Sequence, residues 1–150
     1  MEKYEISKET IAIIGQDDDK TRVLEYDTDK ILNEKAYQVM DYSCSYFGSS
    51  YQGRVDGSRK MLGANYKLPI IVEESSNMIF FPTTSPTLSD CSWISLNAVE
   101  FIDGDSENSI INFKNGKKID VPISKSSLEN QILRATRLQY LLNSRKSEKK

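Results

Sequence analysis

The sequence predicts an α+β protein: a mixed arrangement of mostly antiparallel strands with a central helix and a C-terminal amphipathic helix. Apolar β-branched runs recur along the chain, the apolar period changes to that of a helix in two places, and no βαβ alternation is present. The chain has 150 residues, 38% of them hydrophobic, and no linker rich in Pro or Gly. We therefore expect a single domain over residues 1–143 and a basic, disordered tail over residues 144–150.

The first strands are expected to form a hairpin. Thr10–Ile14 and Arg22–Tyr26 are β-rich runs on either side of an acidic turn, Gln16–Lys20.

The only Trp, Trp93, stands beside an isoleucine, and we interpret it as a core residue rather than an anchor for a partner. Three further short strands are expected at Leu68–Val72, Met78–Phe81 and Val99–Ile102.

The central helix is predicted from residue 34 onward by a change of apolar period. Gly48 stands where a helix C-cap would, so we expect the helix to end there and a Gly/Ser loop, Gly48–Gly57, to follow. The residues at helical spacing are Ala36, Val39, Met40, Ser43, Cys44 and Phe47.

The clearest hairpin signal lies near the C-terminus. Asn115-Gly116 separates two β-rich runs, Ser109–Phe113 and Lys117–Val121, and both residues of that pair tolerate positive φ. The sequence therefore predicts a hairpin with a type I′ turn.

The last element is expected to be a helix from about Ser127 to Ser144. Ser126 and Glu129 have the spacing of a capping box. One face is apolar, and the neighbouring face is basic, which suits a helix that faces DNA but also an ordinary amphipathic helix with solvated arginines. The apolar face carries Leu128, Ile132, Ala135, Leu138 and Leu142, and the neighbouring face Asn130, Arg134, Arg137 and Arg145.

Charge is distributed unevenly along the chain. The net charge is −2, but residues 1–113 hold 10 Lys and Arg against 19 Asp and Glu, and residues 114–150 hold 10 against 3. This asymmetry indicates one basic surface, able to meet phosphate, on an otherwise acidic body. For the last six residues a solvated tail is the better interpretation.

The composition argues against several classes of function. Histidine is absent, so a His-dependent triad and the usual zinc ligands are missing, and Cys44 and Cys91 lie too far apart for a CxxC motif. We expect no metal, no organic cofactor and no enzymatic activity. No run is long enough to span a membrane, and no secretory signal opens the chain, which predicts a cytoplasmic protein.

The most distinctive motif is CSYFGSSYQGR, Cys44–Arg54. Its glycines, the hydroxyls of Ser49 and Ser50, and Arg54 suit contact with phosphate oxygens, although a helix C-cap followed by a packed aromatic turn would read the same way. The cations Arg54, Arg59, Lys60 and Lys67 follow closely, opposed in that segment only by Asp56. A basic run with interleaved aromatics fits nucleic-acid contact, and a solvated loop fits about equally well.

The motif closely resembles the signature of the bacterial competence transcription factor family, ComK. Further segments resemble that family's successive blocks in the same order, so that the resemblance runs from about Ala36 to Tyr140. These segments are LPIIV (Leu68–Val72), IFFPTTSPT (Ile79–Thr87), CSWIS (Cys91–Ser95), FKNGK (Phe113–Lys117) and VPISKSSLENQILRA (Val121–Ala135).

The resemblance implies a cytoplasmic, nucleoid-associated activator of late competence genes. Members of the family bind AT-rich promoter boxes through the minor groove, as dimers that pair into tetramers, and an activator can also contact RNA polymerase. Arginine, lysine and amide side chains suit that groove, whose negative potential is strongest in AT-tracts. From the residues themselves, the candidates for DNA contact are Ser49, Ser50, Arg54, Arg59, Lys60, Lys67, Asn115, Lys117, Lys118, Asn130, Arg134 and Arg137. On the last helix we expect Arg134 and Arg137 to point outward.

The sequence departs from the family at its C-terminus. The resemblance implies a tail beyond the final helix that binds the adaptor MecA and promotes oligomerisation. This sequence stops at Lys150, which argues against MecA as a partner. An alternative function follows: a truncated interaction module that dimerises with a full-length relative and modulates it. Binding to AT-rich duplex over a range of salt would separate the two, because phosphate contacts weaken as salt rises.

Overall fold

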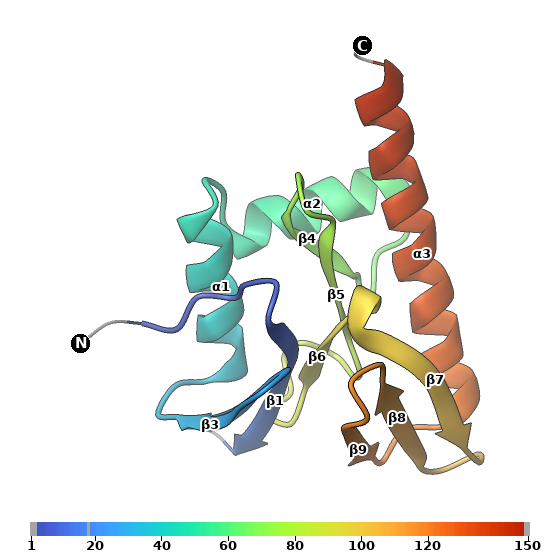
Figure 1. The fold of residues 1–150 in the computed structure, drawn as a ribbon. Coiled ribbons are helices and arrows are strands. Elements are labelled where there is room, and N and C mark those ends of the chain that lie inside the picture. The colour runs from blue at the N-terminus through green and yellow to red at the C-terminus, as the bar shows by residue number, and fades with distance from the viewer. Residues whose placement is uncertain (1–2, 18, 149–150) are drawn as a thin grey trace.

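A computed structural model describes residues 3–17 and 19–148 and confirms the α+β class. Figure 1 shows two β-sheets, with helices on both sides of the larger one. The strands are β1 (Thr10–Asp17), β2 (Lys20–Glu25), β3 (Asp29–Leu32), β4 (Ile70–Glu73), β5 (Met78–Pro82), β6 (Ser92–Ser95), β7 (Val99–Gly104), β8 (Ser109–Phe113) and β9 (Lys118–Val121). The helices are α1 (Ala36–Tyr46), α2 (Tyr51–Leu62), α3 (Lys125–Glu148) and the 3-10 turn η1 (Leu96–Ala98).

The larger sheet is antiparallel throughout and has the order β3-β2-β1-β6-β5-β4. Its central strands are buried on both faces, so successive residues enter different cores. Trp93 and Ile13 pack on the side of α1, and Ile94 and Ile11 pack toward the smaller sheet and α3. Trp93 is 2% exposed, which confirms its interpretation as a core residue.

The smaller sheet, in the order β7-β8-β9, forms a layer with α3 over the second face of the larger sheet. The predicted apolar face of α3 is buried there, with Ile132 partly buried and the other four residues buried. The β8–β9 hairpin is confirmed, but its turn is not type I′. Only Gly116 has positive φ (91°), and the Phe113 amide donates to the Lys117 carbonyl at 2.9 Å. This pattern is typical of a three-residue loop that ends in a bulge, in which Asn115 keeps an ordinary backbone conformation.

The predicted Gly/Ser loop over Gly48–Gly57 is wrong from Tyr51 onward, where α2 begins. Helix α1 ends as expected, with Gly48 at φ 88°. Ser50 then acts as the N-cap of α2, its Oγ accepting from the Gly53 amide at 2.9 Å. Both Gly53 and Gly57 therefore lie inside a helix that is stabilised by its cap and by packing, in spite of their low helix propensity.

Helix α3 starts earlier and ends later than the sequence predicts. The Ser124 Oγ accepts from the Ser127 amide at 3.2 Å, and the Ser124 carbonyl accepts from the Leu128 amide. The predicted cap, Ser126 with Glu129, is therefore wrong, because both residues lie inside the helix and are exposed. The helix covers residues 144–148 of the predicted tail, while residues 149–150 lie outside the described part.

The strand predictions hold in place and differ at their ends. The β1–β2 hairpin is confirmed, but β1 and β2 extend into the predicted acidic turn, since Asp17 pairs with Lys20. Two strands were missed. Strand β3 is largely exposed and polar, and β6 has only four residues, so neither gives a clear periodic signal.

Candidate nucleic-acid interface

Two positively charged segments that are remote in sequence meet where α2 contacts α3. Residues 51–72 hold 4 Lys and Arg against 1 Asp, and residues 125–148 hold 5 against 2 Glu. Residues 73–113, in contrast, hold no Lys or Arg and 7 Asp and Glu. We call the shared region the α2–α3 surface and define it by Arg59, Lys60, Lys67, Asn130 and Arg137.

The α2–α3 surface presents charged groups of differing availability. Arg59 lies in the last turn of α2 and pairs with Asp56, its Nη1 donating at 2.8 Å. Lys60, Asn130 and Arg137 are exposed, and no ion pair of theirs occurs within the described residues. Lys67 is partly exposed in the loop after α2. The surface therefore offers at least two cations, Lys60 and Arg137, to an external partner.

Arg54, the cation of the CSYFGSSYQGR motif, is occupied within the fold. Its Nη1 pairs with Glu74 Oε1 at 3.1 Å, and its side chain is 17% exposed. Its Nε is buried without a partner. The hydroxyl of Ser50 is used as the α2 cap, and the Ser49 amide donates to the Cys44 carbonyl at 3.0 Å. The motif thus builds the α1–α2 corner, and its amides do not form an open phosphate cradle.

Arg134 turns toward the loop that joins α2 to β4 instead of pointing outward as expected. Its Nη2 donates to the Tyr66 carbonyl at 2.7 Å and its Nη1 to the Lys67 carbonyl at 3.1 Å. Gln131, which is 2% exposed, donates to the Lys67 carbonyl as well, at 2.9 Å. Partial burial lowers the pKa of Arg134. Arg137 is exposed as expected, so two arginines three residues apart have different roles.

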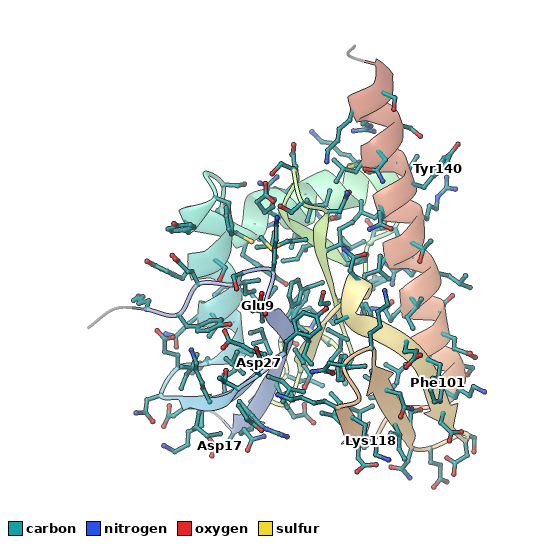
Figure 2. All side chains as sticks on the ribbon, viewed as in Figure 1. Glu9, Asp17, Asp27, Phe101, Lys118 and Tyr140 are labelled. Carbon is teal, nitrogen blue, oxygen red and sulfur yellow. The ribbon has the colours of Figure 1, made fainter. Side chains whose placement is uncertain are left out.

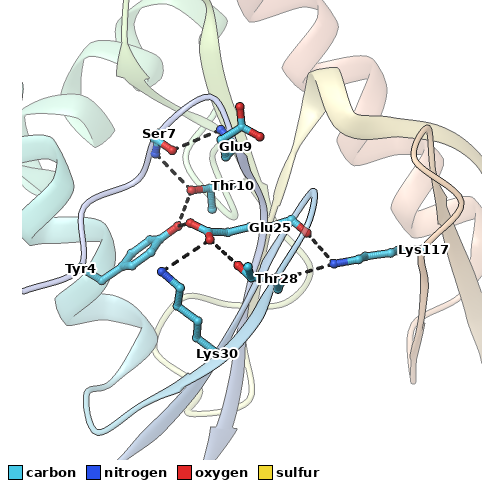
Figure 3. A network of polar contacts seen from close by, with 8 residues as sticks. All are labelled: Tyr4, Ser7, Glu9, Thr10, Glu25, Thr28, Lys30 and Lys117. Atoms are coloured by element: carbon cyan, nitrogen blue, oxygen red, sulfur yellow. Dashed lines mark hydrogen bonds and ion pairs between the residues drawn. The ribbon is translucent and has the colours of Figure 1, made fainter.

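The remaining candidates lie in the hairpin tip, residues 114–118. Asn115 Nδ2 donates to the Tyr26 carbonyl at 3.1 Å, and Lys117 Nζ donates to the carbonyls of Glu25 and Thr28 at 2.7 and 3.2 Å. Figure 3 shows the Lys117 ammonium reaching this turn from the smaller sheet. Lys118 is exposed and lies far from α2, at the opposite end of the molecule (Figures 1 and 2).

The turn that receives Lys117 is itself fixed by a polar network (Figure 3). The Tyr4 hydroxyl donates to Glu25 Oε2 at 2.6 Å, Thr28 Oγ1 donates to Glu25 Oε1 at 2.5 Å, and Lys30 lies 3.5 Å away. Burial by itself would raise the pKa of Glu25, but the hydrogen bonds from Thr28 and Tyr4 and the charge of Lys30 outweigh it and lower that pKa. The hairpin tip therefore docks on a preorganised acceptor.

The described residues contain no cluster of three or more potential metal ligands among Cys, Asp and Glu. Cys44 and Cys91 are both buried and free, and burial raises the pKa of Cys44 to about 11, which suppresses thiolate formation. None of the helices in the described part of the chain is long and apolar enough to span a lipid bilayer.

Comparison with known proteins identifies the family. The family model described as ComK protein matches residues 1–147. The chain belongs to the ComK family. A member from Bacillus subtilis (strain 168), named competence transcription factor, is 36% identical over 143 residues, which is 93% of this chain and 74% of that protein. No solved structure matches the chain.

Within this ComK-family fold, two features of the site escaped sequence reasoning. Gln131 lies in the block that carries the family resemblance but gave no functional signal, because a buried glutamine is visible only once its acceptors are placed. Tyr66 was also missed, and its side chain is 81% exposed in the loop after α2. Its position between Lys60 and Lys67 could have indicated it, since aromatics within a basic run are typical of nucleic-acid surfaces.

Proposed function

We propose that this protein is a DNA-binding transcription activator of competence genes that recognises AT-rich promoter boxes through the minor groove. Membership of the ComK family supports the regulatory role, and the relative's name specifies competence. The observation that carries the proposal for this chain is the α2–α3 surface, where Lys60 and Arg137 are exposed on a protein whose residues 1–50 and 73–113 are acidic.

The chemistry of the α2–α3 surface fits the minor groove of an AT-tract. Lysine and arginine respond to the enhanced negative potential of a narrow groove, and amides such as that of Asn130 suit its acceptors. Helix α3 holds Asn130 and Arg137 on a rigid element, because its opposite face is buried in the core. Binding at this surface would need little reorganisation of the fold.

We propose that the protein acts as a homodimer or higher oligomer in the cytoplasm, on nucleoid DNA, with RNA polymerase as a further partner. Its action would involve no enzymatic step and no cofactor.

Titration of the protein against fluorescent AT-rich and mixed-sequence duplexes, over a range of salt concentrations, tests the proposal. We expect tighter binding to the AT-rich duplex and a linear fall of log Kobs with log salt, with about 0.9 unit of slope per phosphate contact. Equal affinity for both duplexes would contradict AT recognition. Absence of salt-dependent binding to either would contradict the proposed function.

An interaction module that pairs with a relative of this chain remains the second candidate, because α3 has an outward apolar stripe. Leu133 and Tyr140, seven residues apart, are 67% and 68% exposed, and Figure 2 shows Tyr140 pointing away from the body. Under this alternative the stripe would pair with another chain. Sedimentation of the parent and of Leu133→Ser, each mixed with a full-length relative, together with the duplex titration, separates the two: the module would pair with the relative through this stripe and would not bind DNA.

A further inference from the structure

The loop between α2 and β4, residues 63–69, presents an aromatic side chain to solvent. Tyr66 is 81% exposed, more than any other large hydrophobic side chain in the described part of the protein. It is flanked in sequence by Lys60 and Lys67, and Asp56 is the only acidic residue between positions 51 and 72. A single exposed aromatic is common on protein surfaces and would need no explanation by itself.

What distinguishes Tyr66 is the rigidity of the backbone beneath it. The two arms of the Arg134 guanidinium donate to the carbonyls of Tyr66 and Lys67, at 2.7 and 3.1 Å. Lys67 adopts φ 47°, in the left-handed region that L-residues seldom occupy. The loop is thus held in an unfavourable conformation by side chains from α3, 64 or more positions away in sequence.

Gln131 also holds the loop in place by a hydrogen bond. Its Nε2 donates to the Lys67 carbonyl at 2.9 Å and to the Pro82 carbonyl at 2.8 Å, and its Oε1 accepts from Arg134 at 2.7 Å. Because the side chain is 2% exposed, this amide joins the loop to β5 inside the protein. The Arg134 guanidinium therefore makes its hydrogen bonds within the protein. This leaves it poorly placed to contact DNA directly.

The cations around Tyr66 indicate that its partner is a nucleic acid. Arg59 and Lys60 occupy the last turn of α2, where the loop begins, and Lys67 follows Tyr66 directly. Aromatic rings among cations pack against bases while the cations meet phosphates. In proteins that bind the minor groove, apolar side chains are often inserted as wedges between base steps.

We propose that Tyr66 is a wedge that packs against the bases of the bound duplex, and that Gln131 and Arg134 are positioning residues that hold the loop for it. The inference rests on the proposed DNA-binding function and adds the residue that enters the groove. A preorganised loop loses little conformational freedom on binding, so its contacts contribute more fully to affinity.

Tyr66→Ala tests the wedge. We expect affinity for AT-rich duplex to fall by about 5- to 150-fold, the range that stacking on one base represents, with the slope of log Kobs against log salt unchanged. A duplex carrying 2-aminopurine in the AT-tract should brighten when the parent binds and unstacks the base, and should not brighten with the variant. Tyr66→Phe should keep both properties.

Tyr46→Ala is the matched control. Tyr46 is 58% exposed, but it lies on α1, and residues 36–50 contain no Lys or Arg. This variant should bind as the parent does. Tyr66→Ala that binds equally tightly, or a fluorescence increase that survives it, would overturn the wedge.

A double-mutant cycle tests the positioning role of Arg134. If Arg134 acts through Tyr66, then Arg134→Ala should cost little more once Tyr66 is already Ala. If Arg134 touches DNA itself, the two losses should multiply. Arg134→Lys adds a second readout, because lysine would preserve a phosphate contact but lacks the planar guanidinium whose Nη1 and Nη2 hold the Lys67 and Tyr66 carbonyls. We expect Arg134→Lys to bind as weakly as Arg134→Ala, and parent-like binding would overturn the positioning role.

The outcomes separate this inference from the function on which it rests. A parent protein that does not bind duplex contradicts both. A parent that binds while Tyr66→Ala binds equally well contradicts the wedge alone. Thermal unfolding of each variant identifies any loss of the fold. Because Tyr66 is exposed, Tyr66→Ala should melt at the same temperature as the parent. The test of the wedge therefore stays decisive even if an Arg134 variant unfolds.

Discussion

The hairpin tip and the α2–α3 surface carry the same kinds of residue, lysine with a neighbouring amide, and both were predicted from sequence to meet DNA. In the hairpin tip, Lys117 and Asn115 donate to three carbonyls of the β2–β3 turn, at 2.7 to 3.2 Å. On the α2–α3 surface, Lys60 and Arg137 are exposed. Lys114 and Lys118 of the hairpin tip are exposed as well, so the contrast holds for single side chains. A cation is available to a partner where the fold gives it no hydrogen-bond acceptor.

The same contrast recurs within α3. Arg134 and Arg137 are three residues apart, yet the first donates to two backbone carbonyls and the second is exposed. Buried or half-buried carbonyls must be paired, and a nearby guanidinium satisfies two at once. The carbonyls of Tyr66 and Lys67 lie within reach of Arg134, so Arg137 is the arginine that stays free.

The sharpest test of the comparison removes two charges from each region. Lys60→Ala combined with Lys67→Ala should lower the slope of log Kobs against log salt by about 1.8 units, and the affinity by roughly 60-fold at 0.1 M salt. Lys114→Ala combined with Lys118→Ala is the matched control: both lysines are exposed, but the hairpin tip lies far from α2, so the slope should stay unchanged. Equal losses in both would place the hairpin tip on the DNA surface as well.

Stability should show the opposite pattern. Lys117→Met removes a donor shared by two carbonyls and should lower the free energy of unfolding by about 1–2 kcal/mol, since hydrogen bonds to charged groups exceed neutral ones and this site is partly exposed. Lys118→Met, beside it and exposed, should change the value by less than about 0.5 kcal/mol. Denaturant unfolding measures both. If the two variants unfold alike, the contact between the hairpin tip and the turn is not stabilising.

The start of α3 gives a smaller effect. Ser124→Ala removes the acceptor of the Ser127 amide and should cost about 1 kcal/mol, as loss of an N-cap does. Ser126→Ala, inside the helix, should cost nothing measurable or stabilise slightly, because alanine has the better helix propensity. Thermal melts compare them, and the reverse ranking would restore the cap that the sequence predicts.

The smallest expected effect is a pH dependence at the turn under the hairpin tip. The folded-state pKa of Glu25 is lowered, so its stabilising contribution is complete above the unfolded value of about 4.3 and is lost as pH falls through the folded value. Glu25→Gln should therefore reduce stability at pH 7 and flatten this part of the acid limb. A parent and variant with parallel stability curves between pH 6 and 3 would contradict the network in Figure 3.

Elements with a repeating or local sequence pattern could be predicted from the sequence. The apolar faces of α1 and α3, the β8–β9 hairpin and the core position of Trp93 all follow from periodicity or from a local turn signal. Helix α2 could not be predicted, because Gly53 and Gly57 favour a loop. Its cap at Ser50 and the packing of Tyr51 against Trp93, with ring centroids 5.8 Å apart, outweigh that propensity.

The candidate site divides in the same way. Sequence reasoning found the basic segments around Lys60 and Arg137, since charge counts are additive along a chain. It could not find the hydrogen bonds from Gln131 and Arg134 to the Lys67 carbonyl, because these donors lie 64 and 67 positions away from Lys67 in the sequence. Nor could it foresee that Arg54 would pair with Glu74, 20 positions away.

The sequence by itself determined the α+β class, the two amphipathic helices, the basic segments and, through its ordered motifs, the family. These properties depend on residue type and spacing, which the chain carries in one dimension. Only the tertiary structure decided which of the basic and amide side chains are free, because that depends on which of them come to lie within reach of accepting backbone carbonyls. Lys117, Asn115 and Arg134 meet such carbonyls and become parts of the scaffold, whereas Lys60 and Arg137 meet solvent.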